Sequence, residues 1–270
     1  MILFLALVVC MFVYLIYHTY YVKYSTIVLK NESNMPFTIV QLSDIHGQTR
    51  FINGSLSSMV NSTNPDYVVI TGDLISNIQQ LNRVLIELQK INCRNILFVP
   101  GNYEREGANF FKKRLYTQEE HEHIVQSLRN QGIVVLNNSG VLIERAGKQI
   151  LFYGFDNSIY GNEKVTISKK EIQNADHIIL LAHSPSIINL VDLHHLPYDL
   201  LLVGHTHGGQ IRICGRTFGS YKNFHVGLTR FDELKNFYIN RGLGTVKIPV
   251  RFFCPPEIAV FRYDHSQRNR

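Results

Sequence analysis

Phe37–His46 reads FTIVQLSDIH, a near-continuous apolar run that stops at Ser43 and is followed by Asp44 and His46. Runs of this length, bounded by Gly, Pro and Asn, are typical of strands buried on both faces of a sheet. Four further runs have the same form and also end in polar residues: YVVIT (67–71) before Gly72-Asp73, NILFV (95–99) before Pro100-Gly101-Asn102, IILLA (178–182) before His183, and LLLV (200–203) before Gly204-His205-Thr206-His207. We therefore expect a ligand site in the loops where these strands end.

The polar residues after these runs form a set of metal-binding types. The expected donors are two Asp, one Asn and four His: Asp44, Asp73, Asn102, His46, His183, His205 and His207. Imidazole combined with carboxylate and amide oxygen favours Mn, Zn or Fe over Mg or Ca, and differs from a closed Cys-type zinc site. Two divalent ions bring four positive charges and the two Asp remove two, so the remainder attracts an anion such as phosphate.

The order of these motifs carries a resemblance to a known family. Asp-x-His, Gly-Asp, Gly-Asn, a lone His and Gly-His-x-His resemble the calcineurin-like metallophosphoesterases, from about Phe37 to Phe261. Gly204–Ile211, Arg241–Thr245 and Pro255–Ile258 resemble the membrane-associated bacterial branch of that superfamily. Some of its members hydrolyse UDP-2,3-diacylglucosamine in lipid A synthesis, and others act at Gram-positive envelopes. The resemblance implies an α/β fold, a four-layer αββα sandwich, whereas the pattern alone predicts a mixed α/β domain.

The resemblance also implies roles for the seven donors. A metal-bridging hydroxide between two ions would attack phosphorus, because paired metals lower the pKa of bound water. The candidate catalytic residues are Asp73, Asn102, Tyr103 and His183. One metal would be held by Asp44, His46, Asp73 and His207, and the second by Asp73, Asn102, His183 and His205, with Asp73 bridging.

Tyr103 departs from the family pattern, which commonly places His directly after Gly-Asn, where it assists the transition state or the leaving group. A tyrosine with an ordinary pKa near ~10 can donate a hydrogen bond but is a poor general acid at neutral pH. The enzyme is therefore expected to prefer good leaving groups.

Each motif taken alone also has a structural interpretation. A Gly-Asp or Gly-Asn pair is usually a turn, and a lone histidine after an apolar run is more often a hydrogen-bonded structural group than a ligand. The joint pattern favours the dimetal site, because every motif follows an expected strand. The histidines outside the motifs are expected at the surface or behind the ligands: His121, His123, His194, His195 and His225.

The N-terminal segment predicts a membrane anchor. Ile2 to Val22 contains no Asp, Glu, Lys or Arg and is long enough to cross a hydrocarbon core of ~30 Å as a helix. A cleaved signal peptide is the alternative, but a basic start and a small-x-small cleavage site are missing. Lys23 and Lys30 follow the span and favour a cytoplasmic catalytic domain. We expect an anchor at 1–24, a tether at 25–35 and a single catalytic domain at 36–270.

Composition limits the partners. The formal charge of +6 could indicate nucleic-acid binding, but the basic residues form no long run with interleaved aromatics. Attraction of the domain to an anionic membrane surface is the simpler interpretation of this charge. The four cysteines are expected as isolated thiols, and the oligomeric state stays open.

Further elements are expected between the metal loops. An amphipathic helix is expected over 78–91 and another over 119–131, with strands at 133–136, 141–143 and 150–155. Residues 109–116, with Phe110 and Phe111 beside a basic triplet, suit a lip that inserts into an interface or, equally, the start of an ordinary helix.

The sequence therefore predicts a membrane-anchored dimetal phosphoesterase acting on a phosphorylated, lipid-linked substrate such as UDP-2,3-diacylglucosamine. A broad cell-envelope phosphodiesterase or phosphomonoesterase is the enzymatic alternative. A metal-dead protein that binds phospholipids or a partner is the alternative outside enzymes.

Overall fold

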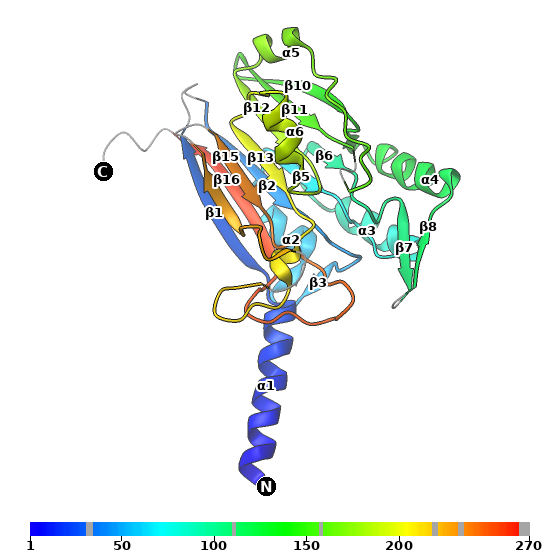
Figure 1. Cartoon of the computed structure of the whole chain (residues 1–270), viewed down its shortest axis with the longest axis vertical. Coiled ribbons are helices and arrows are strands. Elements are labelled where there is room, and N and C mark those ends of the chain that lie inside the picture. Colours follow the sequence, from blue (N-terminus) through cyan, green and yellow to red (C-terminus); the bar gives the residue numbers. More distant parts are fainter. Residues whose placement is uncertain (31–34, 110–111, 157–158, 218–220, 232–234, 265–270) are drawn as a thin grey trace, which may run out of the picture.

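Two six-stranded sheets lie face to face and form the centre of the molecule (Figure 1). The computed structural model describes residues 1–30, 35–109, 112–156, 159–217, 221–231 and 235–264. Side chains from both inner faces fill the space between the sheets, including Ile39, Val69, Phe152, Ile179 and Leu202. The core therefore lies between the sheets, as sheet-on-sheet packing requires.

The first sheet has four parallel strands in succession, β2, β5, β6 and β9, with β16 antiparallel to β2 and β1 parallel to β16. Its strands in spatial order are β1 (Lys23–Lys30), β16 (Glu257–Asp264), β2 (Phe37–Leu42), β5 (Tyr67–Thr71), β6 (Asn95–Val99) and β9 (Val134–Val135).

The second sheet has parallel strands β11, β12, β13 and β15, flanked by antiparallel β10 and β14. In spatial order they are β10 (Ser139–Arg145), β11 (Lys148–Gly154), β12 (His177–Leu181), β13 (Leu200–Val203), β15 (Asn236–Ile239) and β14 (Gly227–Arg230). Two small ribbons pair β3 (Arg50–Phe51) with β4 (Gly54–Ser55) and β7 (Glu106–Asn109) with β8 (Lys112–Leu115).

Helices cover the outer faces and complete the four predicted layers. Helices α2 (Leu56–Asn61), α3 (Leu81–Leu88) and α4 (Gln118–Arg129) contribute to a core against the first sheet, and α6 (Ile187–Leu193) to a core against the second. The remaining short elements are α5 (Lys169–Asn174) and the 3-10 turns η1 (Ile78–Gln80) and η2 (His207–Gly209). The predicted α/β sandwich is confirmed.

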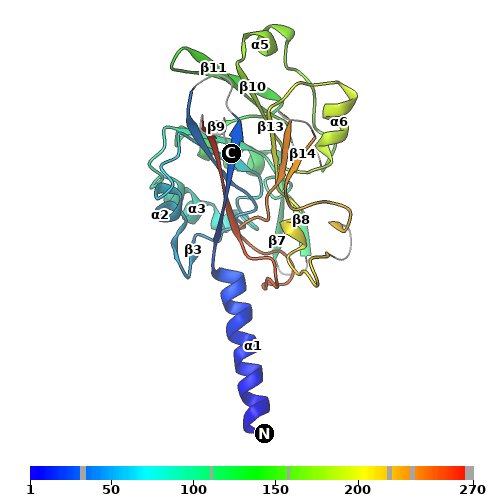
Figure 2. The same ribbon diagram turned by 90° about the vertical axis from the view of Figure 1, so that its left-hand side faces the viewer.

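Helix α1 (Ile2–Tyr20) projects away from the sheets in both views (Figures 1 and 2). Its 19 mostly apolar residues are long enough to cross a membrane, and only 6% of its most apolar 18-residue stretch is buried within the molecule. One N-terminal apolar helix is thus present, as the sequence predicted.

The predicted tether is wrong in its first half. Residues 25–30 belong to β1, which pairs with β16 along its whole length, from Lys23 opposite Glu257 to Lys30 opposite Asp264. The strand forms because Leu29 inserts into the core between the sheets and Ser25 hydrogen-bonds to the buried Glu257. Helix α1 ends at Tyr20, so only two residues separate it from the sheet.

Three other predictions need adjustment. The helix expected over 78–91 is a 3-10 turn followed by α3, and Ile91 is buried beyond its end. The helix expected over 119–131 is α4, which differs only at its ends. Residues 106–109 and 112–115 form the paired strands β7 and β8 rather than a helix start, while Phe110 and Phe111 of the expected lip lie outside the described residues.

Candidate metal centre

The seven expected donors follow strands β2, β5, β6, β12 and β13, and the fold brings them together at one edge of the two sheets. The strands β2, β5 and β6 are parallel neighbours, as are β12 and β13, so their carboxyl ends meet there. Six donors form two groups, and within each group the ligand atoms lie within 4.8 Å of one another. Asn102 lies beside the second group.

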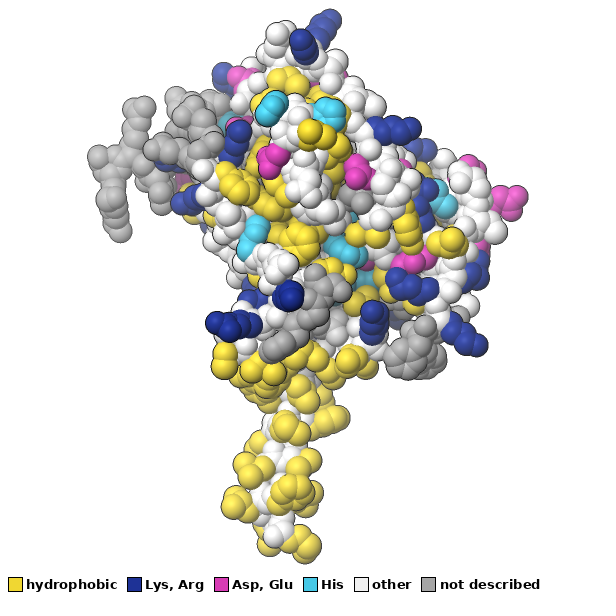
Figure 3. Space-filling view, in the orientation of Figure 1, with side chains coloured by type: hydrophobic (Ala, Val, Ile, Leu, Met, Phe, Trp, Pro, Cys, Tyr) yellow, Lys and Arg dark blue, Asp and Glu magenta, His cyan; other side chains and the backbone are white. Residues whose placement is uncertain are grey.

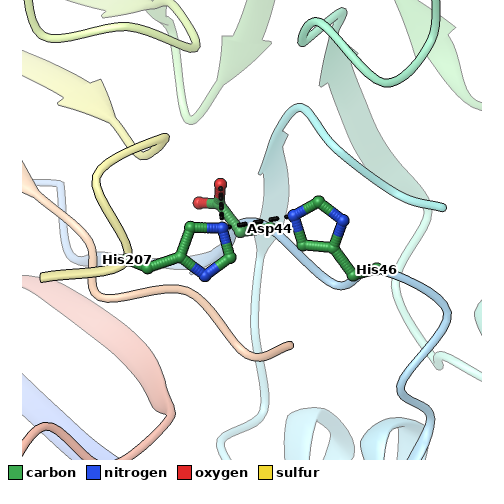
Figure 4. A group of neighbouring side chains, drawn as sticks. All are labelled: Asp44, His46 and His207. Atoms are coloured by element: carbon green, nitrogen blue, oxygen red, sulfur yellow. Dashed lines mark hydrogen bonds and ion pairs between the residues drawn. The ribbon is translucent and has the colours of Figure 1, made fainter. Parts of the chain in front are cut away.

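The first group joins Asp44, His46 and His207, whose side chains point toward one another in Figure 4. His207 Nε2 lies 3.3 Å from Asp44 Oδ1 and 3.2 Å from His46 Nε2. Ligands held about 2.1 Å from one ion lie roughly 3.0–3.4 Å apart, so these spacings suit a shared cation. Asp44 Oδ1 is also buried without a hydrogen-bond partner among the described residues, which leaves a lone pair for such an ion.

The second group joins Asp73, His183 and His205, with Asn102 beside them. His183 Nε2 lies 3.2 Å from Asp73 Oδ2, 3.0 Å from His205 Nδ1 and 3.2 Å from Asn102 Oδ1. Four donor atoms from four separate loops therefore face one point. Nitrogen and oxygen without sulfur is a donor set that fits Mn, Zn or Fe.

Asp73 lies between the two groups. Its Oδ2 is 3.2 Å from His183 Nε2 and 3.6 Å from His46 Nε2, while its Oδ1 accepts the backbone N–H of Tyr103 at 2.9 Å. One carboxylate oxygen is thus within reach of both positions. This is the geometry that a bridging ligand requires.

Hydrogen-bonding contacts at the Nδ1 atoms orient the rings of His183 and His46. His183 Nδ1 donates to the backbone carbonyl of Thr71 at 2.8 Å, and His46 Nδ1 lies 3.1 Å from Ser76 Oγ. Each contact leaves the Nε2 atom facing the other donors. Fixing one ring nitrogen in this way sets the tautomer and orientation of a metal-binding histidine.

Glu104 holds the loops that carry the donors, and sequence analysis missed it. Its fully buried carboxylate accepts backbone N–H groups from Gly101 at 2.6 Å, Leu74 at 2.9 Å and Asp73 at 3.0 Å. His121, expected at the surface or behind the ligands, is buried and its Nδ1 donates to the Glu104 carbonyl at 2.8 Å. No motif marks Glu104, because its partners are backbone groups.

Five of the seven donor residues adopt the left-handed backbone conformation. The φ angles are 49° at Asp44, 46° at His46, 56° at Asp73, 68° at His205 and 51° at His207. Residues other than glycine adopt this region at a cost, and such positions cluster at functional sites. These turns aim consecutive side chains into the site.

Gly72, just before Asp73, is required for close approach. Its φ is +81°, and a Cβ there would lie 2.6 Å from both His183 Nδ1 and the Gly101 nitrogen. The glycine of the Gly-Asp motif therefore lets two loops touch.

Burial keeps most of the histidines neutral. It lowers the pKa of His46 to about 4 and, together with the charge of His183, that of His205 to about 3. Burial also tends to lower the pKa of His183, but the adjacent Asp73 carboxylate outweighs it and raises that pKa to about 10. Asp44, desolvated by burial, has its pKa raised to about 6. His46, His205 and His207 are therefore neutral, the state in which an imidazole binds a metal, whereas His183 forms an ion pair with Asp73.

A cavity of about 280 Å³ opens above the donors. Its wall includes Tyr103, Lys113 and Tyr221. Lys113 belongs to the predicted lip segment 109–116, whereas Tyr221 belongs to no motif and was missed from the sequence. Tyr221 Oη lies 3.1 Å from His205 Nε2, and Lys113 Nζ lies 5.0 Å from the centre of the Tyr103 ring. Burial and the charge of Asp73 raise the pKa of Tyr103 above its ordinary value, so its hydroxyl keeps its proton.

Comparison with known proteins gives one consistent result. The family described as calcineurin-like phosphoesterase matches residues 37–209, which include all seven donors. The metallophosphoesterase YkoQ of Bacillus subtilis is 28% identical over 94% of this chain and 96% of its own length. YkuE of the same organism is 30% identical over 83% of this chain and 78% of its own length, and the phosphodiesterase YaeI of Escherichia coli is 29% identical over 83% and 81%.

Proposed function

The chain belongs to the calcineurin-like phosphoesterase family, and from that premise we propose that its seven converged donors hold two divalent ions for hydrolysis of a phosphoester or phosphoanhydride bond. Family membership makes the protein a metal-dependent phosphohydrolase. The observation that carries the dimetal assignment is the position of Asp73 Oδ2 between the two groups of donors. The proposed ions are Mn, Zn or Fe, which this donor set favours.

In this proposal, each side chain has a defined task. When bound, paired ions lower the pKa of a water molecule and hold the attacking and leaving oxygens. Tyr103 retains its proton and donates a hydrogen bond to a substrate oxygen, while Lys113 offers a positive charge to the phosphate. Asp44, His46, Asp73 and His207 would hold the first ion, and Asp73, Asn102, His183 and His205 would hold the second.

The proposed substrate is a lipid-linked phosphoanhydride such as UDP-2,3-diacylglucosamine. Phosphate leaving from an anhydride needs little protonation, which suits a site that offers Tyr103 where relatives commonly offer histidine. The alternative is a broad cell-envelope phosphodiesterase or phosphomonoesterase, and the similarity to a relative named phosphodiesterase favours the diesterase form. The seven converged donors argue against a metal-dead binding protein.

The proposed location is a membrane, with α1 as an uncleaved anchor and the catalytic domain on the cytoplasmic side. The support is the apolar, largely unburied α1 and the lysines Lys23 and Lys30 that follow it. The intact chain should resist carbonate extraction and keep Met1, whereas a chain lacking residues 1–20 should be soluble. Recovery of a shortened mature N-terminus would contradict the anchor.

The test of function is a substrate panel on metal-stripped protein reloaded separately with Mn, Zn and Fe. The proposal predicts turnover only after reloading, and a higher kcat/KM for the sugar-nucleotide anhydride than for an alkyl diester or monoester. Preference for the alkyl diester would favour the envelope enzyme. Equal activity with and without metal would contradict the dimetal assignment.

A further inference from the structure

Large apolar side chains are exposed on the loops that surround the end of α1. Ile52 is 57% exposed, Ile213 51%, Ile248 53% and Phe253 56%. Figure 3 shows hydrophobic side chains gathered at the base of the domain, where α1 leaves it. Scattered apolar residues are normal on a surface, but a gathered set marks an interaction site.

These loops are fixed to α1 by specific contacts. The Phe253 ring lies 5.7 Å from the Tyr14 ring and 5.8 Å from the His18 ring. The backbone N–H of Arg251 donates to Thr19 Oγ1 at 2.9 Å. The loop residues 251–253 therefore lie beside the last two turns of α1, rather than beyond its end.

The length of α1 then sets the depth of Phe253. The 19-residue helix is about 29 Å long, close to the ~30 Å thickness of a hydrocarbon core. If it spans the bilayer, its whole length lies within the hydrocarbon core, up to Tyr20 at the boundary. Tyr14 lies about 9 Å along the axis before Tyr20. If α1 spans a bilayer, a side chain that contacts Tyr14 lies within the apolar layer or at its boundary.

The charge around this surface matches an anionic membrane. Residues 205–230 and 235–256 contain no Asp or Glu. Within them, Arg216, Lys222 and Lys247 are exposed. Each Lys or Arg near an anionic lipid surface contributes about 1 kcal/mol of attraction.

The same loops form part of the cavity wall. Ile211, Val246, Lys247 and Ile248 line the cavity above the metal donors. The two loops are joined, because the backbone N–H of Arg212 donates to the carbonyl of Phe252 at 2.9 Å. A substrate that enters between them passes the apolar surface.

We propose that residues 211–216 and 246–253, the membrane-facing rim, insert into the surface of an anionic bilayer beside α1. The cavity then receives an amphiphilic phosphoester whose phosphate reaches the donors while its acyl chains stay in the bilayer. This inference rests on the proposed function and on α1 as the anchor, and it commits the rim to lipid rather than to a second protein.

Depth can be measured directly, because the chain contains no tryptophan. The full chain carrying Phe253→Trp is reconstituted in anionic vesicles with brominated acyl chains, next to a Leu193→Trp control. Leu193 ends α6 and is 73% exposed. We expect strong fluorescence quenching for Phe253→Trp and none for Leu193→Trp. Equal quenching of both, or of neither, would overturn the inference.

The effect on catalysis separates the rim from the metal site. Phe253→Asp should lower kcat/KM on a vesicle-embedded amphiphilic phosphoester by about tenfold, because a buried apolar contact with lipid becomes a charge, and should leave hydrolysis of a water-soluble aryl phosphodiester unchanged. Leu193→Asp should change neither rate. An unchanged rate of Phe253→Asp on the embedded substrate would overturn the rim proposal. If the wild-type chain does not hydrolyse the aryl phosphodiester at all, the proposed function is contradicted instead.

Discussion

The metal floor, meaning the seven donors, differs in construction from the cavity wall formed by Tyr103, Lys113 and Tyr221. Floor residues come directly after buried parallel strands, and six of the seven are buried. Wall residues come from loops and a hairpin, and the side chain of Lys113 is 47% exposed. The floor consists of metal-binding side chain types, whereas the wall consists of two tyrosines and a lysine. We infer that the floor sets the type of reaction and the wall sets the choice of substrate.

The largest effect is expected from changing the floor itself. Asp73→Asn weakens the proposed bridging ligand, which lies between the two groups, and His205→Ala removes a donor of the second group. Because changing even the partners of ligands costs 10–100-fold, kcat/KM should fall by more than about a hundredfold on every substrate. Metal content per chain and turnover are the measurements.

Two variants control for general effects of these changes. Asp176→Asn removes a surface carboxylate paired with Lys148, and His194→Ala removes an exposed histidine. Both should retain wild-type turnover. Full activity in Asp73→Asn would refute the shared-ligand assignment.

An intermediate effect is expected from Glu104, which holds the loops that carry the donors. Glu104→Gln replaces a carboxylate that accepts three backbone N–H groups with an amide that has only one acceptor oxygen. Metal affinity should weaken by about 10–100-fold, measured by calorimetric titration of the metal-stripped protein.

Glu87→Gln is the control, because Glu87 is also buried, at 6% exposure against 0% for Glu104, but accepts from Ser57 rather than from the loops that carry the donors. It should lower the free energy of unfolding and leave metal affinity unchanged. If both variants weaken metal binding alike, the effect of Glu104 is one of general stability.

The smallest effect is expected at the wall, and it should change selectivity rather than total activity. Tyr103→His supplies a general acid, which contributes on the order of 10²–10⁴-fold to alkyl leaving groups when well placed. The ratio of alkyl-ester to anhydride kcat/KM should rise by about tenfold, and Tyr103→Phe should remove only one hydrogen bond. An unchanged ratio in both variants would show that Tyr103 merely packs beside His46, whose ring lies 4.7 Å away.

The floor was predictable from the sequence because each donor lies within four residues of the end of an apolar strand. His205 and His207 are separated by one residue, and a strand end fixes where both point. Asp73 could be predicted from the preceding Gly72 and the apolar run at 67–71 alone. Local pattern and global fold agree at these positions, which is why the motif order was sufficient.

The wall and the edge of the first sheet were not predictable in the same way. Tyr221 reaches His205 only because the intervening loop returns to the site. Strand β1 begins two residues after α1, and Tyr24, Thr26, Ile27 and Val28 are residue types that favour strands. Its partner β16 lies more than 230 residues further along the chain, so the pairing cannot be seen in the local sequence. Long-range pairing of this kind leaves no signal in a window of neighbouring residues.

The left-handed turns at five of the floor residues have a consequence for folding stability. Each such turn costs about 1 kcal/mol, a substantial part of a typical stability of about 5–15 kcal/mol when all five are counted. The folded body therefore supplies the energy that holds these turns, through bonds such as His46 N–H to the Asp73 carbonyl at 3.0 Å. Because asparagine tolerates this conformation well, Asp73→Asn should keep the turn itself, so its loss of activity would come from the changed ligand and not from a changed backbone.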